Sequence, residues 1–482
     1  MPAYATDAPP GLHTLLADLP LPAPLAVAPL DSLGRVLLAL QASAGDAAVV
    51  VDPESRAPLG VLTLRETVAA VVEGAVGLEE PVVGAMTGGM PCLPADATVQ
   101  QATVLMVRRG LRHLLLVAAD GSFVNLVSRG ELYGLRAAGS ERVVQGLLAT
   151  RDIAELAAAA GEVRAFAARR LAEGVGPEAL CPWISALNDI VTVHAIDLVE
   201  GATDLPVIPW CWLVFGSEGR LEQTPTTDQD NGIIFEADSA AHAAELRRAF
   251  VPFAQAVNRA LDACGFPLCQ GGIMAGNPAW CLSLEEWRRT FAGWIGTTAP
   301  KALLNATIFF DFRPLYGRED LAAALRQWLL GRIGRNSAFL RAMAANALES
   351  SPPLGLWNRF RYDGNREHPR TLDLKMQGSR FFVDAARIFA LAHGIPHTNT
   401  VERLRGARLA LGMPVEETAA AVEAFYQIQR LRLAGHLSGG RPGAANRVNP
   451  AGLHDLDRHI LREALRHARR LQQRVSLDFP PP

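Results

Sequence analysis

Runs of apolar residues and their spacing predict where strands and helices lie in this chain. Short continuous apolar runs, which are typical of buried strands, occur at residues 47–51, 210–215 and 233–235. From residue 320 onward, apolar side chains instead recur every three or four residues, which predicts helices at 321–330, 337–348, 371–393, 400–411, 415–437 and 453–475, and prolines and glycines interrupt the pattern. The pattern therefore predicts α/β and α+β domains in the first part of the chain and an all-helical bundle in the last part.

The first part of the chain contains an internal repeat. Pro29 corresponds to Pro94 and Glu66 to Glu131, an offset of 65 residues at both ends. Each copy predicts the order strand, helix, strand, strand, helix, and we expect one domain at residues 1–140 with copies at about 25–75 and 90–140. The predicted helix and the two strands after it lie at 32–42, 47–51 and 60–63 in one copy, and at 98–109, 114–117 and 123–128 in the other.

The chain after the repeat alternates between helical and strand-like stretches. Helical spacing predicts a connector at residues 141–200 and a helix at 240–264 that ends before Gly265. The run at residues 306–314 is strand-like and contains Asp311 and Arg313. An unpaired charge among such apolar neighbours would be costly, so a structural pair between these two residues is one interpretation.

Candidate chemistry is concentrated between two of the predicted strands. Gly216 and Ser217 allow a tight turn whose backbone N–H groups and hydroxyl suit a phosphate. Asp228 and Asp230 precede the next strand at a spacing of two, which puts both carboxylates on one face. Such close like charges repel unless a cation lies between them, and Mg²⁺ or Mn²⁺ prefers oxygen ligands. We interpret the segment as a metal–phosphate site, and the alternative is a turn-rich surface loop.

The same segment resembles the signature of the polymerase-β-type nucleotidyltransferase superfamily. The resemblance is carried by Gly216, Ser217, Gly219, Arg220, Glu222, Gln223 and residues 227–231 (Thr-Asp-Gln-Asp-Asn). It is strongest to nucleotidyltransferases that accompany CBS domains in bacteria and are related to GlnD-type PII uridylyltransferases, and it extends over about residues 150–480. It implies a nucleotidyltransferase palm at 201–335 and a helical bundle at 336–482 that closes over the nucleotide or holds the acceptor.

The resemblance also implies roles for individual residues. Asp228 and Asp230 would bind two Mg²⁺ or Mn²⁺ ions together with Asp311, by its position the best candidate for a third carboxylate on a later strand. Gly216 and Ser217 would hold the triphosphate. Arg220 would add charge to the phosphates or pair with Glu222. Lys375 would reach the phosphates from the bundle or remain an exposed helix residue.

The repeat resembles a tandem CBS pair, a module that in many proteins binds adenine nucleotides between its copies. The ligand signature of that family corresponds to Thr63 and Glu66 in one copy and to Ser128 and Glu131 in the other. Both pairs also have the spacing of helix capping boxes, so ribose binding and capping both stay open. The resemblance implies regulation by an adenine nucleotide, and we expect a homodimer.

Composition and charge narrow the function classes. The formal net charge is −3 and the isoelectric point is about 6.4, without basic tracts, so we expect neither nucleic acid nor an anionic membrane as a partner. The six cysteines are scattered, without a Cys-x-x-Cys pair. We identify no signal peptide and no apolar run of membrane-spanning length, and therefore expect a cytoplasmic bacterial protein.

Our leading hypothesis is a metal-dependent nucleotidyltransferase that moves a nucleoside monophosphate from a nucleoside triphosphate to an acceptor. By resemblance, the acceptor would be a protein hydroxyl, as in PII uridylylation, and the CBS pair would regulate transfer in signal transduction. The competing hypothesis is a non-catalytic regulatory protein that senses adenine nucleotides and only binds nucleotide or a partner at the palm.

Overall fold

A computed structural model gives the fold of the protein. It describes residues 15–19, 21–42, 47–63, 67, 76–108, 111, 113–128, 140–225, 227–297, 299–334, 336–437 and 444–480. The chain divides into two compact units, Met1–Leu148 and Ala149–Pro482.

The first half of the N-terminal unit is a small sheet with one helix. Strand β1 (Leu25–Val27) pairs in parallel with β2 (Ala47–Val51) after helix α1 (Leu33–Ala42). Strand β3 (Pro58–Thr63) pairs antiparallel with β2, and β4 (Thr87–Gly88) extends the sheet beyond β3. This order agrees with the strand, helix, strand, strand predicted from the sequence.

The second half of this unit repeats the arrangement. Strand β5 (Cys92–Pro94) pairs in parallel with β6 (His113–Val117) after helix α3 (Val99–Arg108), and β7 (Phe123–Ser128) pairs antiparallel with β6. One apolar cluster joins residues of both halves: Ala47, Val49, Val61, Leu115 and Leu126. The two halves therefore share a core. Most of the helix that closes each predicted copy lies outside the described residues.

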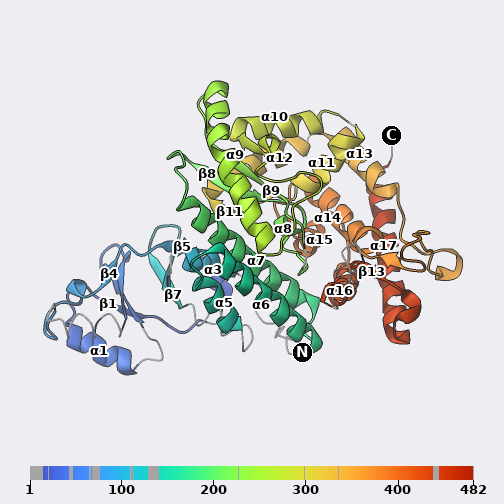
Figure 1. The fold of residues 1–482 in the computed structure, drawn as a ribbon. Coiled ribbons are helices and arrows are strands. Elements are labelled where there is room, and N and C mark those ends of the chain that lie inside the picture. The colour runs from blue at the N-terminus through green and yellow to red at the C-terminus, as the bar shows by residue number, and fades with distance from the viewer. Residues whose placement is uncertain are drawn as a thin grey trace. The chain divides into compact units, whose positions relative to one another are not determined.

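A four-stranded mixed sheet forms the centre of the C-terminal unit (Figure 1). Strand β8 (Trp210–Val214) pairs antiparallel with β9 (Asn231–Phe235) on one side and with β11 (Arg313–Gly317) on the other. Strand β10 (Cys281–Ser283) runs parallel to β9 at the edge. The sequence predicted β8 and β9, and their loop carries the candidate chemistry.

Both faces of this sheet are buried, which explains why β8 is continuously apolar. On one face, the Trp210 ring lies 5.4 Å from Phe250 of α9 (Ala240–Ala263). On the other, Leu213 lies in a cluster with Trp287 and Phe291 of α10 (Leu284–Ile295) and with residues of α12 (Glu319–Ile333). Because Trp287 and Phe291 are fully buried, the tryptophan- and phenylalanine-rich stretch of α10 serves packing.

The strand predicted at residues 306–314 was wrong. Helix α11 (Pro300–Phe309) occupies its first four residues, and β11 begins only at Arg313. Pro300 at the first helical position favours a helix start here. The short apolar run at 308–310 fits a buried helix end as well as a strand. Asp311 therefore lies in the connection between helix and strand.

Helices α6 (Ile153–Ala172) and α7 (Pro177–Glu200) follow α5 (Ser140–Leu148) in the predicted connector. Among the described residues, α7 is the one helix whose length and mean hydropathy of 1.3 would suit a membrane span. However, 72% of its apolar window is buried, and it packs against α6 and α9. Helix α7 thus has the packing of a core helix.

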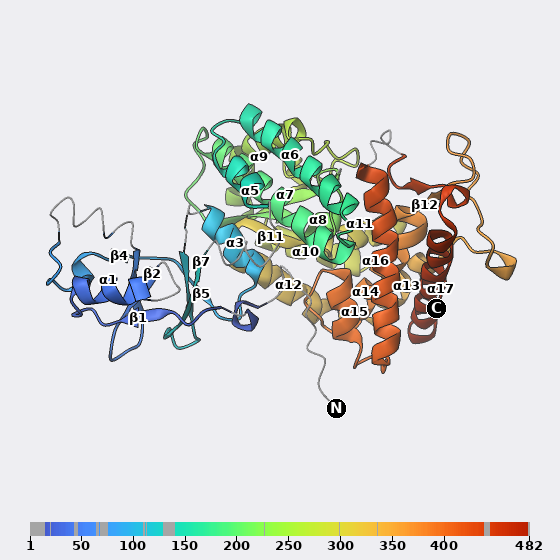
Figure 2. The same ribbon diagram turned by 90° about the horizontal axis from the view of Figure 1, so that it is seen from below.

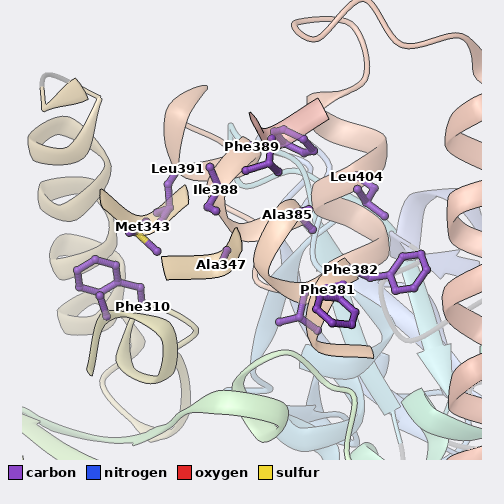
Figure 3. Packing of buried hydrophobic residues seen from close by; sticks show 14 of the residues in the cluster. Phe310, Met343, Ala347, Phe381, Phe382, Ala385, Ile388, Phe389, Leu391 and Leu404 are labelled. Carbon is purple, nitrogen blue, oxygen red and sulfur yellow. The ribbon is translucent and has the colours of Figure 1, made fainter. Parts of the chain in front are cut away.

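The predicted helical bundle is present in the same unit (Figure 2). Its helices are α13 (Ser337–Leu348), α14 (Arg380–Ala392), α15 (Thr400–Ala407), α16 (Val415–Leu437) and α17 (Asp455–Asp478). Helix α14 is buried along almost its whole length, and Figure 3 shows Ile388 and Leu391 of α14 near Met343 of α13.

The single helix predicted at 371–393 is divided in the structure. A short strand, β12 (Leu372–Asp373), pairs with β13 (Arg447–Val448), and a π-helical turn, η5 (Lys375–Ser379), leads into α14. Such turns occur often at functional sites.

Candidate active site

The loop after β8 makes a turn that needs glycine. Gly216 has φ +56°, a left-handed conformation, and a Cβ atom there would lie 3.0 Å from Asp230 Oδ2. At Gly219, an added Cβ would lie 1.7 Å from the Asp311 carbonyl oxygen. A side chain at 219 is therefore excluded, and one at 216 would be strained by the backbone and would crowd Asp230.

Buried amides beside the two candidate acids fix the backbone that carries them. Gln229 Nε2 donates hydrogen bonds to the carbonyl oxygens of Asn258 (2.9 Å) and Phe266 (2.8 Å). Asn258 Nδ2 in turn donates to Asn231 Oδ1 at 3.0 Å. Gln229 and Asn231 are buried, whereas Asp228 is exposed and Asp230 is half-buried, so the residues alternate as in an extended strand.

One cavity collects most of the residues predicted for catalysis and phosphate binding. It has a volume of about 450 Å³, within the usual range for small-molecule sites. Gly216, Ser217, Arg220, Asp228, Asp230 and Lys375 all line it. The bundle residues Ser379, Arg380, Asp384, Arg387, Gln429 and Arg432 line it as well. The cavity therefore lies where the sheet domain meets the bundle.

The two acids at the cavity carry uncompensated negative charge. Burial, and after it the charge of Asp228, raises the pKa of Asp230 to about 6. A hydrogen bond from the Cys269 thiol and the positive charge of Lys375 oppose this rise in pKa. Neither Asp228 nor Asp230 forms an ion pair with any described residue, so a cation would stabilise the site.

The donor set fits a hard divalent cation such as Mg²⁺, because both acids supply carboxylate oxygens on the same cavity wall. Within the described ranges, no group of three or more His, Cys, Asp or Glu side chains is arranged to hold a metal. The remaining ligands would therefore come from substrate phosphates and water, as is usual for Mg²⁺.

Asp311 has a different environment from the one expected of a third metal ligand. It is fully buried, does not line the cavity, and accepts hydrogen bonds from three arginines. These come from Arg220 Nη1 (2.8 Å), from Arg387 Nε and Nη2 (3.0 and 2.7 Å) and from Arg403 Nη1 (2.6 Å). Both carboxylate oxygens are thus occupied by guanidinium groups.

The alternative partner of Asp311 is placed elsewhere too. Arg313 pairs with Asp189, with Nη2 2.5 Å from Oδ1, so the Asp311–Arg313 pair is not formed. Arg220 bridges Asp311 and Glu222, and its Nε lies 2.8 Å from Glu222 Oε2. Arg220 therefore has the Glu222 partner considered from the sequence and still lines the cavity.

The bundle holds the loop that follows Gly216. Thr398 Oγ1 donates to the Gly219 carbonyl oxygen at 2.6 Å, and Asn399 Nδ2 donates to that of Arg220 at 3.0 Å. The backbone N–H of Thr400 donates to Glu222 Oε1 at 2.7 Å. The start of α15 thus fixes the position of the phosphate-turn segment.

Several cavity and support residues were not identified from the sequence, among them Arg387, Arg403 and Arg432. Arg387 lies in α14, where every residue from Phe381 to Leu391 is buried. It pairs with Asp384, Nη1 lying 2.7 Å from Oδ1. The sequence signal for this pair was an acid and an arginine three residues apart in a largely apolar stretch. Such spacing indicates a buried ion pair, because a buried charge needs a partner.

The predicted adenine-nucleotide residues are only partly described. Thr63 and Ser128 end β3 and β7, where Thr63 pairs with Ala47 and Ser128 with His113 in the equivalent registers. Glu66 and Glu131 lie outside the described residues.

Three family models match the chain. “Putative nucleotidyltransferase DUF294” matches residues 161–301, “Putative nucleotidyltransferase substrate binding domain” matches residues 337–479, and “CBS domain” matches residues 82–137. The first match contains the Gly216 turn and both cavity acids, and the second contains Lys375 and α14 to α16. No curated protein matches the chain.

Solved structures similar to the chain include three proteins with CBS domains. One, from Pyrobaculum aerophilum and complexed with AMP, has 20% identity and a TM-score of 0.23, and the match covers 25% of this chain and 90% of that one. Another, from Agrobacterium tumefaciens, has 28% identity and a TM-score of 0.22, with 25% and 93% covered. A signal-transduction protein from Burkholderia ambifaria has 20% identity and a TM-score of 0.23, with 25% and 90% covered.

The chain thus carries a nucleotidyltransferase domain of the DUF294 type, the substrate-binding domain that accompanies it, and a CBS domain.

Proposed function

We propose that this protein is a metal-dependent nucleotidyltransferase that moves a nucleoside monophosphate from a nucleoside triphosphate to an acceptor. The observation that carries the proposal is the cavity between the two matched domains. Two uncompensated carboxylates and a glycine–serine turn lie on its nucleotidyltransferase wall, and cationic side chains lie on its bundle wall. Carboxylates and cations that line one cavity suit a polyphosphate that is bound together with a divalent cation.

Each residue has a role in this proposal. Asp228 and Asp230 hold the Mg²⁺ or Mn²⁺, and Ser217 and Lys375 bind the phosphates. The ion, when bound, lowers the pKa of an acceptor hydroxyl and stabilises charge on the leaving pyrophosphate. Asp311 is assigned to positioning, since it holds Arg220 at the cavity wall with both oxygens already occupied.

The acceptor and the regulation extend the proposal. We propose a protein hydroxyl as acceptor, on the resemblance of the Gly216–Asn231 segment to PII uridylyltransferases. We further propose that an adenine nucleotide binds the N-terminal repeat and regulates transfer, on the CBS match and on the position of Thr63 and Ser128 at equivalent strand ends. The cytoplasmic location and the homodimer stay proposals from the sequence.

The test is transfer of label to a macromolecule. Wild-type protein is incubated with Mg²⁺, a bacterial lysate and each α-labelled nucleoside triphosphate in turn. Asp228→Asn and Asp230→Asn should each lose transfer and divalent-ion binding together while the fold is retained, because each removes one carboxylate of the pair. Asp238→Asn, which removes a 98% exposed carboxylate of the same domain, is the matched control and should keep both. Transfer near the wild-type rate in either cavity variant would refute the metal-site assignment.

A non-catalytic regulator is the second candidate. It is favoured by the absence, among the described residues, of a third acid arranged with the pair to hold a metal ion. This candidate predicts that nucleotide binds the cavity of the wild-type protein while no triphosphate labels any acceptor. Labelling that depends on Asp228 would exclude it.

A further inference from the structure

Cationic residues of the cavity differ in whether their charge is neutralised. Within the described parts of the chain, five cationic side chains line the cavity: Arg220, Lys375, Arg380, Arg387 and Arg432. Arg220 and Arg387 pair with Asp311, and Arg380 Nε lies 3.1 Å from Asp384 Oδ2. Lys375 and Arg432 form no ion pair with any described residue. Two positive charges at the cavity are therefore left over.

Arg432, on α16, needs a neutralising partner more than Lys375 does, because it is only 8% exposed. Its Nε donates to Asn446 Oδ1 at 2.9 Å, and its Nη1 donates to Gln429 Oε1 at 2.6 Å and to Ser379 Oγ at 3.4 Å. All three acceptors are neutral. They orient the guanidinium without neutralising it, and burial lowers the pKa of Arg432 to about 10.

A buried cation without a counter-ion costs free energy unless an anion joins it. The second amino group of Arg432, Nη2, donates to none of the described residues and belongs to a side chain that lines the cavity. A planar guanidinium with a free edge matches phosphate oxygens, which accept two parallel hydrogen bonds. The missing partner is therefore an anion that enters from the cavity.

The π-helical turn before α14 brings the second cation to the same wall. Gly378 lets this turn approach α16, since an added Cβ there would lie 3.0 Å from Ile428 Cγ2. The close approach brings Ser379 Oγ within hydrogen-bond distance of Arg432 Nη1. Lys375, at the start of the turn, lines the cavity, and its positive charge acts to lower the pKa of Asp230. The π-helical turn thus brings Ser379 to Arg432 and places Lys375 at the cavity.

We propose that Arg432 and Lys375 form a phosphate subsite on the substrate-binding domain, which takes the terminal phosphates of the triphosphate opposite the two acids. The inference deepens the proposed function and rests on it for the identity of the ligand. It assigns the recognition of the leaving phosphates to the bundle and leaves the nucleotidyltransferase domain to bind the metal.

Calorimetry with inorganic tripolyphosphate on the full-length chain tests the subsite apart from transfer. Arg432→Gln should weaken tripolyphosphate binding roughly tenfold to a hundredfold, the loss expected for hydrogen bonds to a charged group. Adenosine affinity should stay unchanged, because adenosine has no phosphate. Arg430→Gln is the matched control on the same helix, since Arg430 is half-exposed, pairs with Asp457 and lies outside the cavity. It should bind tripolyphosphate like the wild type.

A melting curve of each variant separates binding from folding. Arg432→Gln removes an unneutralised buried charge, so its melting temperature should equal or exceed that of the wild type. If Arg432→Gln does not fold, Lys375→Gln, which changes an exposed residue, should still weaken tripolyphosphate binding at least several-fold. Wild-type tripolyphosphate affinity in folded Arg432→Gln, or in Lys375→Gln where the first variant does not fold, would overturn the subsite.

The two proposals fail in different ways. If Asp228→Asn abolishes labelling while Arg432→Gln binds tripolyphosphate like the wild type, the subsite is wrong and the proposed function stands. If no triphosphate labels an acceptor while Arg432→Gln still loses tripolyphosphate, the subsite stands and the transfer reaction is wrong.

Discussion

Replacing Asp311 with asparagine should destabilise the protein strongly, although Asp311 itself does not line the cavity. The change keeps the size of the side chain and removes one negative charge that four hydrogen bonds connect to Arg220, Arg387 and Arg403. All three guanidinium groups are mostly or fully buried. They hold the pKa of Asp311 well below its usual range despite burial of the carboxyl, so the charge is present at every ordinary pH.

The magnitude follows from breaking a buried ionic cluster, which costs about 3–5 kcal/mol when one partner loses its charge. Arg403 has no other carboxylate partner among the described residues and would be left buried and unpaired. The unit Ala149–Pro482 contains Asp311, and its unfolding entropy is roughly 2 cal/mol/K per residue. The loss therefore corresponds to a fall in Tm of roughly 4–7 °C.

Thermal unfolding of Asp311→Asn at pH 7, followed by circular dichroism, measures this fall. The control is Asp320→Asn, which breaks a pair with Arg318 whose side chains are 58% and 59% exposed and should melt like the wild type. Because the pKa of Asp311 is lower in the folded state, its stabilisation is present above the unfolded pKa of about 3.9 and is lost as the pH falls further. The difference between variant and wild type should therefore shrink below pH 4. If Asp311→Asn melts within about 1 °C of the wild type at pH 7, which is about a fifth of the expected fall in Tm, the reasoning is refuted.

Three further predictions concern the turn, the acid pair and the repeat. Gly216→Ala should lower the free energy of unfolding by about 1–2 kcal/mol, because of the left-handed backbone, and should weaken metal and nucleotide binding by crowding Asp230. Gly412→Ala, where φ is +60° and no atom lies within 4 Å of the added Cβ, should show only the loss of stability in melting curves. Asp230→Asn without divalent ions should raise Tm at pH 7 but not at pH 4. Because the pKa of Asp230 is raised to about 6 in the folded protein, its charged carboxylate destabilises the fold only as the pH rises above about 4, and fully above 6. Equal shifts in Tm at both pH values would contradict this. In full-length Asp228→Asn, AMP, ADP or ATP should still raise Tm through the repeat, and Glu66→Ala with Glu131→Ala should abolish the shift; an unchanged shift would favour the capping role of these glutamates.

Local sequence patterns were enough to predict β8 and β9 and the turn and acid pair between them. The apolar runs at β8 and β9 are short and continuous, which is a local signal of buried strands. Gly216 is required by the closeness of Asp230, only fourteen positions away, and the alternation of acids with buried amides follows from the period of an extended strand. Helices α13 and α16 were predicted at their observed limits for the same reason, since a regular apolar period defines them.

The partners of Asp311 could not be predicted, because they depend on contacts between distant segments. Arg387 and Arg403 lie 76 and 92 positions after Asp311, and no local pattern connects them to it. Arginine usually lies at the surface, and no sequence pattern indicates that these two arginines are buried. The helix at α11 was missed because residues 308–310 are apolar on all sides, so periodicity could not distinguish the end of a buried helix from a strand.

The hydrogen bonds from Thr398, Asn399 and Thr400 to the Gly219–Glu222 segment have a consequence for synthesis. These partners lie 178 or 179 positions apart, so the segment acquires them only after α13, α14 and the start of α15 have left the ribosome. Before that, Asp311 has Arg220 as its only arginine partner, since Arg387 and Arg403 also come from the bundle. A fragment that ends before residue 337 would therefore bury a carboxylate with too few partners. The nucleotidyltransferase and substrate-binding domains, although matched as separate families, are expected to fold as one unit and to be inherited together.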